Sequence, residues 1–237
     1  MVATPNALII NEVIGPTIQG EGVHLGTPCI FVRLAGCNLS CSWCDTPYAW
    51  DWSRFDKTVE ARAWPTERVA HRVRALSGKN VRHLVISGGE PLLQGRGVAQ
   101  LVHDLRQDGW TSELETAGTL RPPTLTMVDH FTISPKLSNS HQRPDTAPRA
   151  INRENLQYFA TAQSRCFKFV VTSAGDYEEI DELVTSCRLS PIYIMPEGTV
   201  AEDVNAALPD IAAEAIKRNY RVTPRLHITM YGDKRGV

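Results

Sequence analysis

The chain has 237 residues, 42% of them hydrophobic, which is long enough to bury a core of its own without disulfides. Its 25 Lys and Arg residues nearly balance 26 Asp and Glu residues, which argues against a nucleic-acid or anionic-membrane partner. No apolar run approaches the length of a membrane span and the first residues lack a secretory-signal pattern, so we expect one cytoplasmic domain over residues 1–237.

Apolar, β-branched runs recur along the chain and predict strands. These runs cover residues 8–14, 29–35, 83–88, 112–116, 130–134, 166–172, 191–195 and 220–228. Stretches with helical spacing lie between several of them, and this alternation indicates parallel βαβ units. About six core strands fit the chain, fewer than the eight of a closed barrel. We therefore predict an α/β fold built as a partial (β/α) barrel.

Three helices follow from the pattern of apolar residues. The first lies in residues 97–109, where Gly109 is a plausible stop, and the second spans residues 176–187. The third lies in residues 199–219; Thr199 and Glu202 predict a capping box at its start, and Pro209 is expected to kink or divide it.

Two segments carry no regular pattern. Residues 46–66 hold five aromatic side chains after Cys44, and residues 137–152 are polar and contain prolines. We expect the second segment to be a surface loop or lid.

Polar clusters follow the predicted strands. The cysteine-rich loop comes after residues 29–35, and "SGGEP", "ETAG", "SPK" and "MPEG" end four later strands. Because ligands of parallel α/β folds bind at the carboxyl ends of the strands, these clusters predict one site along a single rim.

The cysteine-rich loop contains Cys37, Cys41 and Cys44 in a C-x3-C-x2-C spacing. Thiolates bind soft metals, but a structural zinc site needs a fourth ligand, and no second motif supplies one. His24 and His83 are single residues on or beside strands, and we interpret them as ordinary histidines. Three cysteines can hold a [4Fe–4S] cluster and leave one iron open to another ligand. Packing of three cysteines without a metal is the simpler alternative.

The cysteine spacing followed by "GGEP" resembles the radical S-adenosylmethionine (SAM) superfamily, in which an aromatic residue such as Trp43 often precedes the last cysteine. The resemblance implies that SAM chelates the open iron and that its reductive cleavage yields a 5′-deoxyadenosyl radical. Because Gly88 and Gly89 lack a Cβ atom, we expect their backbone to approach SAM closely.

Longer stretches narrow the resemblance. "NEVIGPTIQGEGVHLGTPCIFVRLAGCNLSCSWCDT", "VISGGEP", "ETAGT", "SPK" and "RLHITMYGDKRGV" are similar to the 7-carboxy-7-deazaguanine synthase (QueE) family over most of the chain, except near 47–80 and 137–165. Members convert 6-carboxy-5,6,7,8-tetrahydropterin to 7-carboxy-7-deazaguanine and ammonia, on the route to 7-deazapurines such as queuosine. The resemblance also implies a homodimer and an external electron donor such as flavodoxin.

The resemblance assigns roles to individual residues, and it implies no catalytic side chain beyond the cofactors. Residues expected to contact the pterin are Ile18, Gln19, Gly20, Ser87 and Arg33, the last through the substrate carboxylate. Residues expected to contact SAM are Gly89, Glu115, Ser134, Pro135, Lys136, Met195, Pro196, Glu197 and Gly198. Thr46 is expected to bind Mg²⁺ together with substrate oxygens.

Several residues near these positions have simpler interpretations. Asp45 and Thr46 could form a turn after the cysteine loop, and Glu21 could hold its loop rather than move protons. The aromatic residues of segment 48–55 could dock an electron donor or pack their loop. The basic C-terminal tail is left out of the predicted site.

The expected reaction begins with abstraction of the hydrogen at C6 of the pterin and continues with ring contraction, with SAM regenerated. Two other functions remain open at this point. A radical SAM activase would place a glycyl radical on a large partner and needs neither Arg33 nor Thr46. An electron-transfer or structural iron–sulfur or zinc module needs no rim of polar residues.

Overall fold

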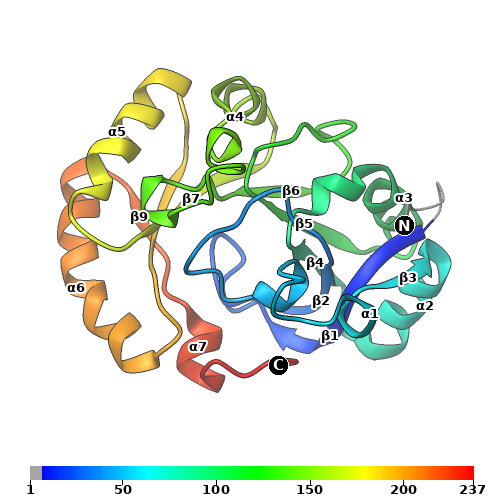
Figure 1. Cartoon of the computed structure of the whole chain (residues 1–237). Helices are drawn as coiled ribbons and strands as arrows, with labels where there is room; N and C mark the ends of the chain where they lie inside the picture. The colour runs from blue at the N-terminus through cyan, green and yellow to red at the C-terminus, as the bar shows by residue number, and fades with distance from the viewer. Residues whose placement is uncertain (1–6) are drawn as a thin grey trace.

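A computed structural model describes residues 7–237, in which nine strands form one curved sheet (Figure 1). The strands are β1 (Ala7–Ile18), β2 (Pro28–Leu34), β3 (Arg62–Pro65), β4 (His83–Gly88), β5 (Thr111–Thr116), β6 (His130–Ile133), β7 (Arg165–Val171), β8 (Ile192–Pro196) and β9 (Arg221–Val222). The helices are α1 (Lys57–Glu60), α2 (Thr66–Ser77), α3 (Gly95–Arg106), α4 (Arg153–Phe159), α5 (Asp176–Cys187), α6 (Ala201–Arg218) and α7 (Leu226–Tyr231). Short 3₁₀ turns are η1 (Pro47–Ala49), η2 (Pro91–Gln94), η3 (Ser138–Ser140) and η4 (Ala147–Arg149).

The sheet order is β3-β1-β2-β4-β5-β6-β7-β8-β9. Every neighbouring pair from β2 onward is parallel, whereas β1 runs antiparallel between β3 and β2. In Figure 1 the strands curve around a central space and the larger helices lie outside them. This arrangement is the predicted partial barrel: six parallel strands, a two-residue seventh (β9) and an antiparallel pair at the other edge.

Alternation along the strands separates the core from the interior of the barrel. In β4, Leu84 and Ile86 pack in the hydrophobic core, whereas the side chains of His83 and Ser87 lie on the opposite face of the strand. In β5, Leu114 packs in the same core. Successive side chains of a strand point to opposite faces, so these residues divide between helices and barrel interior. Polar residues of β2, β5, β6 and β7 lie on the face of the sheet that points into the barrel. These residues are Arg33, Glu113, Glu115, Thr132 and Lys168.

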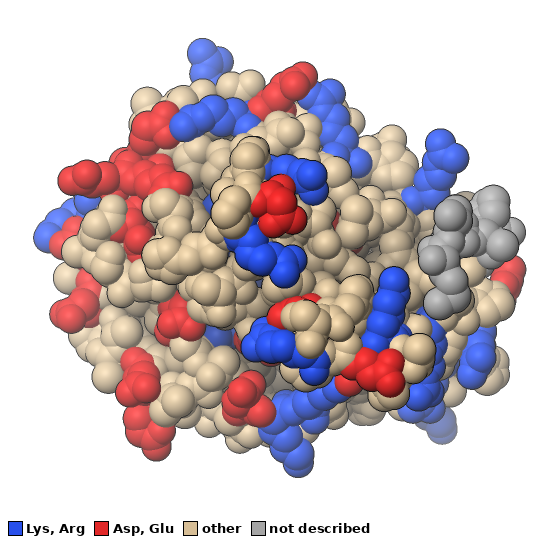
Figure 2. Space-filling model, viewed as in Figure 1, with Lys and Arg blue, Asp and Glu red and all other residues tan. Residues whose placement is uncertain are grey.

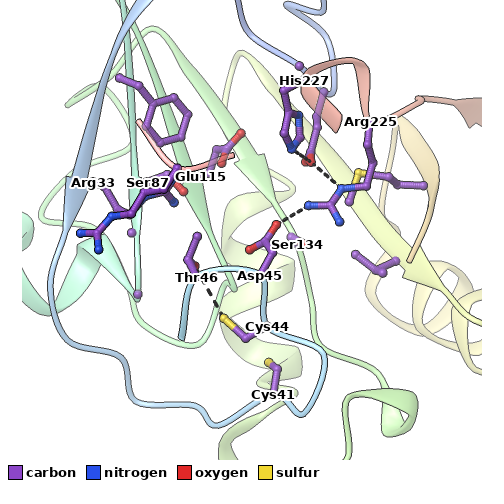
Figure 3. A pocket seen from close by; sticks show the side chains of 18 of the residues that line it. Arg33, Cys41, Cys44, Asp45, Thr46, Ser87, Glu115, Ser134, Arg225 and His227 are labelled. Atoms are coloured by element: carbon purple, nitrogen blue, oxygen red, sulfur yellow. Dashed lines mark hydrogen bonds and ion pairs between the residues drawn. The ribbon is translucent and has the colours of Figure 1, made fainter. Parts of the chain in front are cut away.

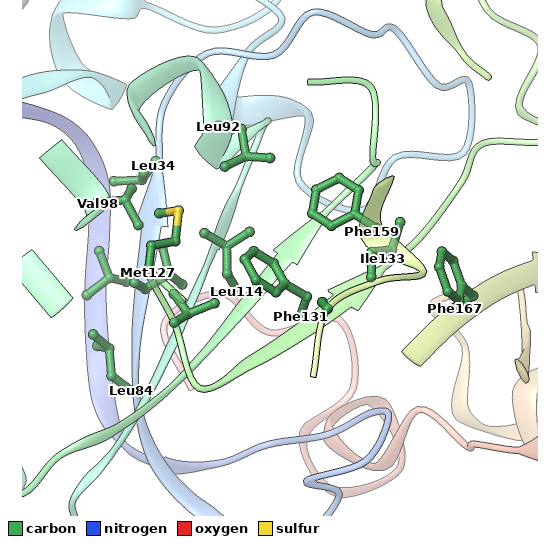
Figure 4. Packing of buried hydrophobic residues seen from close by; sticks show 14 of the residues in the cluster. Leu34, Leu84, Leu92, Val98, Leu114, Met127, Phe131, Ile133, Phe159 and Phe167 are labelled. Carbon is green, nitrogen blue, oxygen red and sulfur yellow. The ribbon is translucent and has the colours of Figure 1, made fainter. Parts of the chain in front are cut away.

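The core fills the layer between the sheet and its helices (Figure 4). Phe131 of β6 and Phe159 of α4 are buried and meet edge to face, with ring centroids 5.4 Å apart. Leu114 lies beside Phe131 in Figure 4, and Phe167 extends the cluster toward β7. This layer fixes the strands whose ends carry the polar clusters.

The structure differs from three sequence predictions. Residues 220–228 do not form one strand, because β9 stops at Val222 and α7 begins at Leu226, after Pro224, which has no N–H for a sheet. Helix α6 is continuous through Pro209, and its N-cap is Val200 without a side-chain hydrogen bond, so the predicted capping box does not form. Segment 46–66 is also more regular than predicted, since it contains η1, α1 and β3.

Helix α2 was absent from the sequence predictions. Val69, Ala70 and Val73 lie on its buried face, but the other buried residues, Thr66 and Ser77, are polar, so the apolar signal is short. Within residues 7–237, no helix is long and apolar enough to cross a membrane.

Candidate active site

A cavity of about 250 Å³ opens at the carboxyl ends of the parallel strands, where the sequence predicted a site. The predicted residues on its wall are Ile18, Gln19, Gly20, Arg33, Cys37, Cys41, Cys44, Thr46, Ser87, Gly89, Glu115, Ser134, Lys136, Met195 and Glu197. Pro135, Pro196 and Gly198 adjoin this set in sequence but do not line the cavity. Figure 3 shows Arg33, Ser87 and Glu115 on one side, Arg225 and His227 on the other, and Asp45 and Thr46 between them.

Each of the three loop cysteines accepts a hydrogen bond from one N–H group at its sulfur. The donors are the backbone N–H of Leu39 to Cys37 Sγ (3.4 Å), Gln142 Nε2 to Cys41 Sγ (2.9 Å) and Trp50 Nε1 to Cys44 Sγ (3.3 Å). All three cysteines are free thiols on the cavity wall. Burial raises the pKa of Cys37 to about 12, so this thiol keeps its proton until a metal replaces it. The arrangement suits metal thiolates better than isolated thiols.

The segment 137–152, which we expected to be a surface loop or lid, packs against the cysteine loop. Gln142 Oε1 accepts from the backbone N–H of Ser40 (2.6 Å), and Asn139 O accepts from Trp43 Nε1 (2.9 Å). The Ser140 carbonyl accepts from the Ser42 N–H (2.9 Å). The segment therefore supports the cysteines directly, and Gln142 is a site residue that the sequence did not reveal.

The "GGEP" stretch serves the packing of the backbone. A Cβ atom on Gly88 would overlap the backbone of Leu34, and one on Gly89 would overlap that of Gly36. Because these glycines have no Cβ atom, the loop after β4 can pack closely against the end of β2. The sequence predicted only a close approach of this backbone to SAM. Glu90 is fully buried and accepts from Thr116 Oγ1 (2.8 Å) and the Ala117 N–H (2.9 Å), which joins this loop to the end of β5.

A buried ionic network crosses the cavity. The carboxylate of Glu21 pairs with Lys168 Nζ and, at 3.2 Å, with Arg225 Nε. Arg225 also pairs with Asp45 and donates to the carbonyl of Gly198. Burial alone would raise the pKa of Glu21, but the charges of Lys168, Arg225 and His227 outweigh it and hold that pKa well below its ordinary value. Glu21 is therefore a charged anchor for its loop.

Arg33 lies on the opposite wall. Its Nε donates to Glu12 Oε1 (2.8 Å), and its guanidinium carbon lies 5.0 Å from the ring centroid of Phe31. Residues 7–237 provide no hydrogen-bond partner for its terminal Nη atoms, which remain available to an anion. Ser87 pairs with Arg33 in the register of β2 and β4, so both side chains lie on the inner face.

Gln19 connects two carboxyl groups below this wall. Its Nε2 atom lies 3.3 Å from Glu113 Oε2 and 3.1 Å from Glu115 Oε1. Burial and the nearby Glu21 and Glu113 charges raise the pKa of Glu115, although Lys168 opposes this shift. Because both contacts use the amide nitrogen, the amide oxygen of Gln19 is available to accept a hydrogen bond from a ligand.

The strand ends on the far side place Lys136 next to the cysteine loop. Lys136 Nζ donates to Ser134 Oγ (2.8 Å) and lies 5.6 Å from the ring centroid of Trp43. Thr46 Oγ1 is 3.6 Å from Cys44 Sγ and makes no cap hydrogen bond to the turn η1 that follows. The Thr46 hydroxyl therefore caps no turn, and its one local hydrogen bond within residues 7–237 is the contact with Cys44 Sγ.

Several residues of the cavity wall were not predicted from the sequence. Lys168 is an inner-face residue of β7 inside the apolar run "CFKFVVT", and this interruption of an apolar run was the available signal. Arg225 and His227 come from the segment first interpreted as a strand. The C-terminal tail, which we had left out, also lines the cavity through Lys234 and Arg235.

The face that looks down the barrel carries charges of both signs. Figure 2 shows Lys and Arg side chains next to Asp and Glu side chains around the centre of this face. Such a mixed rim agrees with the balanced composition and indicates a small polar ligand rather than a polyanion.

Known proteins share both the sequence and the geometry. Residues 18–146 match a family described as a 4Fe-4S single cluster domain. A 7-carboxy-7-deazaguanine synthase of Pyrobaculum aerophilum is 38% identical over the whole of both chains, and one of Rhodopirellula baltica is 34% identical over 99% of this chain and 91% of its own. The crystal structure of QueE from Escherichia coli superposes with a TM-score of 0.67 at 28% identity, covering 93% of this chain and 95% of that chain.

Replacing Glu21 tests the ionic network. We expect Glu21→Gln to lower the free energy of unfolding at pH 7 by about 3–5 kcal/mol, because Lys168 and Arg225 keep buried charges without their partner. A carboxylate with a depressed pKa stabilises the fold above its unfolded pKa of about 4.3, and this stabilisation is lost as the pH falls through the folded pKa. The difference between wild type and variant should therefore shrink as the pH is lowered from about 4.3.

Urea unfolding followed by circular dichroism at several pH values measures this difference. The control is Glu182→Gln, which removes an exposed pair with Arg153 and should shift the unfolding midpoint far less. A loss for Glu21→Gln that stays constant down to pH 3 would contradict the assigned charge state.

Proposed function

The chain belongs to the 7-carboxy-7-deazaguanine synthase (QueE) family, radical SAM enzymes of queuosine biosynthesis that use a [4Fe–4S] cluster, and we propose that its cavity takes 6-carboxy-5,6,7,8-tetrahydropterin as substrate. The observation that carries this proposal is the single cavity in which three hydrogen-bonded cysteines face Arg33, Gln19 and Thr46. End-to-end similarity to synthases favours this function over that of an activase.

The cysteine set fits the cluster. Cys37, Cys41 and Cys44 supply three thiolates, and each sulfur has one N–H donor. Such donors stabilise sulfur-centred charge and influence the reduction potential of a cluster. When bound, the cluster and SAM supply the electron and the hydrogen-abstracting group. The residues proposed to hold SAM on the cavity wall are Gly89, Glu115, Ser134, Lys136, Met195 and Glu197, and Pro135, Pro196 and Gly198 adjoin them.

Arg33 and Gln19 are proposed to orient the pterin. Arg33 binds the substrate carboxylate through its free Nη atoms, while Glu12 holds its Nε. Gln19 presents its amide oxygen to a donor on the pterin edge, because Glu113 and Glu115 hold its nitrogen. Ile18, Gly20 and Ser87 complete this wall. A Cβ atom on Gly20 would overlap the ring of His227, so close packing also fixes the backbone there.

Thr46 is proposed to bind Mg²⁺ jointly with the substrate. A single neutral hydroxyl binds Mg²⁺ weakly, and the ion prefers several oxygen ligands. The Thr46 hydroxyl lies on the cavity wall without a cap hydrogen bond, whereas the neighbouring Asp45 is already paired with Arg225. The ion would therefore be completed by substrate oxygens and water.

The partners expected from the resemblance remain proposals. These are a flavodoxin-like electron donor and a second copy of the chain. Two aromatic residues of segment 48–55 contact the site itself: Trp50 donates to Cys44, and Tyr48 lies under Arg235, with 4.0 Å between its ring centroid and the guanidinium carbon. Their packing role is thus supported, and Phe55 shares it by packing edge to face on Tyr48, with ring centroids 6.2 Å apart, so Trp52 is the aromatic residue proposed for a donor.

The chain's own residues position and enclose the substrate. Arg33 and Gln19 fix the pterin from two sides, which would set its C–H bond for abstraction and reduce the entropic cost of reaction. The C-terminal tail lines the cavity with Lys234 and Arg235, so it helps to exclude water from the reacting carbon.

An anaerobic assay tests the substrate. Reconstituted enzyme supplied with SAM, a reductant and 6-carboxy-5,6,7,8-tetrahydropterin should release 7-carboxy-7-deazaguanine and ammonia in equal amounts. We expect no stoichiometric 5′-deoxyadenosine, because SAM is regenerated. Absence of product would overturn the proposed substrate, and one 5′-deoxyadenosine per product would overturn regeneration of SAM.

Thr46 variants test the magnesium site. Thr46→Val removes the hydroxyl at nearly constant volume and should raise the Mg²⁺ concentration needed for half-maximal activity about tenfold or more, as loss of supporting ligand interactions does elsewhere. Thr46→Ser keeps the hydroxyl and should retain the wild-type Mg²⁺ requirement. Equal Mg²⁺ dependence in both variants would remove Thr46 from the site.

Gln142 variants test the support of the cluster. Gln142→Leu deletes the N–H donor to Cys41 Sγ, which makes the sulfur richer in electrons. The midpoint potential of the cluster, measured by redox titration with electron paramagnetic resonance, should become more negative. Gln100→Leu on the exposed face of α3 is the matched control and should leave the potential unchanged. An unchanged or more positive potential in Gln142→Leu would contradict this role.

A further inference from the structure

Three histidines and a glutamate gather inside the barrel at the end opposite the cysteines. His83 begins β4, Glu113 lies in β5 and His130 begins β6, all on the inner face, and His24 reaches them from the loop between β1 and β2. The ring centroids of His24 and His83 are 4.7 Å apart, and those of His24 and His130 are 5.0 Å apart. No local pattern groups these residues, since each histidine stands alone in the sequence.

The inner ring nitrogens of two of these histidines have no partner. His83 and His130 are 7% and 4% exposed, and their Nε2 atoms are buried without a hydrogen bond from residues 7–237. The distance from His83 Nε2 to Glu113 Oε2 is 3.7 Å, too long for a hydrogen bond. Burying an unpaired polar atom costs free energy, so this arrangement indicates a group that is bound between them.

The outer nitrogens are oriented by hydroxyl groups. His83 Nδ1 lies 2.9 Å from Thr111 Oγ1, and His130 Nδ1 lies 2.8 Å from Ser164 Oγ. In metal sites the non-ligating nitrogen of a histidine is typically held in this way, which fixes the tautomer and directs the other nitrogen at the metal.

We propose that His24, His83 and Glu113 bind a structural divalent transition-metal ion, with Zn²⁺ the best match, at the closed end of the barrel. Their ligand atoms all lie within 4.8 Å of one another, and His24 Nδ1 is 2.9 Å from Glu113 Oε2. Tetrahedral Zn²⁺ with bonds of about 2.0–2.1 Å spaces its ligands by roughly 3.3 Å, so small shifts complete the site. His130, whose Nε2 also lacks a partner within residues 7–237, lies beside these three but outside the set, so water would take the fourth position. The His24 side chain is 30% exposed and gives the ion a path inward.

The ion would fix the loop of residues 19–27 to the sheet. This loop carries Gln19 and Glu21 into the cavity, and His24 contacts β4 and β5 beside the contacts that Gln19 makes with β5. Glu113 also lies 3.3 Å from Gln19 Nε2, so the proposed site positions a pterin-facing residue without touching the substrate. The metal site does not depend on the substrate proposed above.

Zinc binding to the reconstituted holoenzyme tests the site, because its cysteines are then occupied by the cluster. Equilibrium dialysis at buffered free Zn²⁺, with zinc and iron both counted by elemental analysis, should give one saturable zinc per chain at constant iron. His83→Gln should weaken binding by about 100-fold or more, whereas His103→Gln on the exposed face of α3 should not change it. Equal zinc affinity in wild type and His83→Gln, or no saturable zinc, would overturn the proposal.

A second variant tests the site independently in case His83→Gln does not fold. Thr111 is exposed, so Thr111→Val leaves the interior intact, and it should weaken zinc binding by about 10–100-fold while Thr111→Ser restores it. X-ray absorption at the zinc edge should show nitrogen and oxygen neighbours, and sulfur neighbours would place the zinc in the cysteine loop instead. Zinc should also slow amide hydrogen exchange in residues 19–27 of the wild type, and no slowing would contradict the structural role.

Discussion

The buried contact of Glu21 with Lys168 and Arg225 is the interaction on which the cavity depends. It joins the loop after β1, the inner face of β7 and the segment before α7, which are far apart in sequence. Arg225 extends the network to Asp45, next to the cysteine loop, and to the carbonyl of Gly198 after β8. Five parts of the rim are thus held together by this one network. Because a buried ion without its partner is costly, the rim can keep this geometry only when all members are present.

The alternation of side chains between the two faces of the sheet places the ionic network inside the barrel. Apolar residues on the outer face of the sheet pack against the helices, while Arg33, Glu115 and Lys168 on the inner face point into the interior. A barrel of six full strands leaves room there, and the cysteine loop and the C-terminal tail close part of it. The same alternation that makes the core therefore places charged groups where water is scarce and their interactions are strong.

The sequence predicted the parts of the site that local patterns encode. The cysteines and the polar clusters at strand ends could be found because each follows a recognisable apolar strand, whereas Thr46 was predicted from the family resemblance. Gln142, Arg225 and the histidine cluster could not, because their roles arise from contacts between segments distant in sequence. The glycines of "GGEP" were expected to lie at the site, and they do. They must be glycines because the chain packs closely against Leu34 and Gly36, and no local pattern shows this packing. Helix α2 was missed because only Val69, Ala70 and Val73 give its buried face an apolar signal, while the other buried residues, Thr66 and Ser77, are polar.

Gln19 links the two ends of the barrel interior. Glu113 belongs to the histidine cluster at the closed end and Glu115, two residues later in β5, belongs to the cavity at the open end. The amide nitrogen of Gln19 lies between them, 3.3 Å from one carboxyl and 3.1 Å from the other, and has one proton for each. An ionised Glu113 therefore fixes which way the amide faces, and so which atom of Gln19 meets the substrate. A metal ion that holds the Glu113 carboxylate in position would keep this acceptor in place, so the closed end would contribute to recognition at the open end without contacting the ligand.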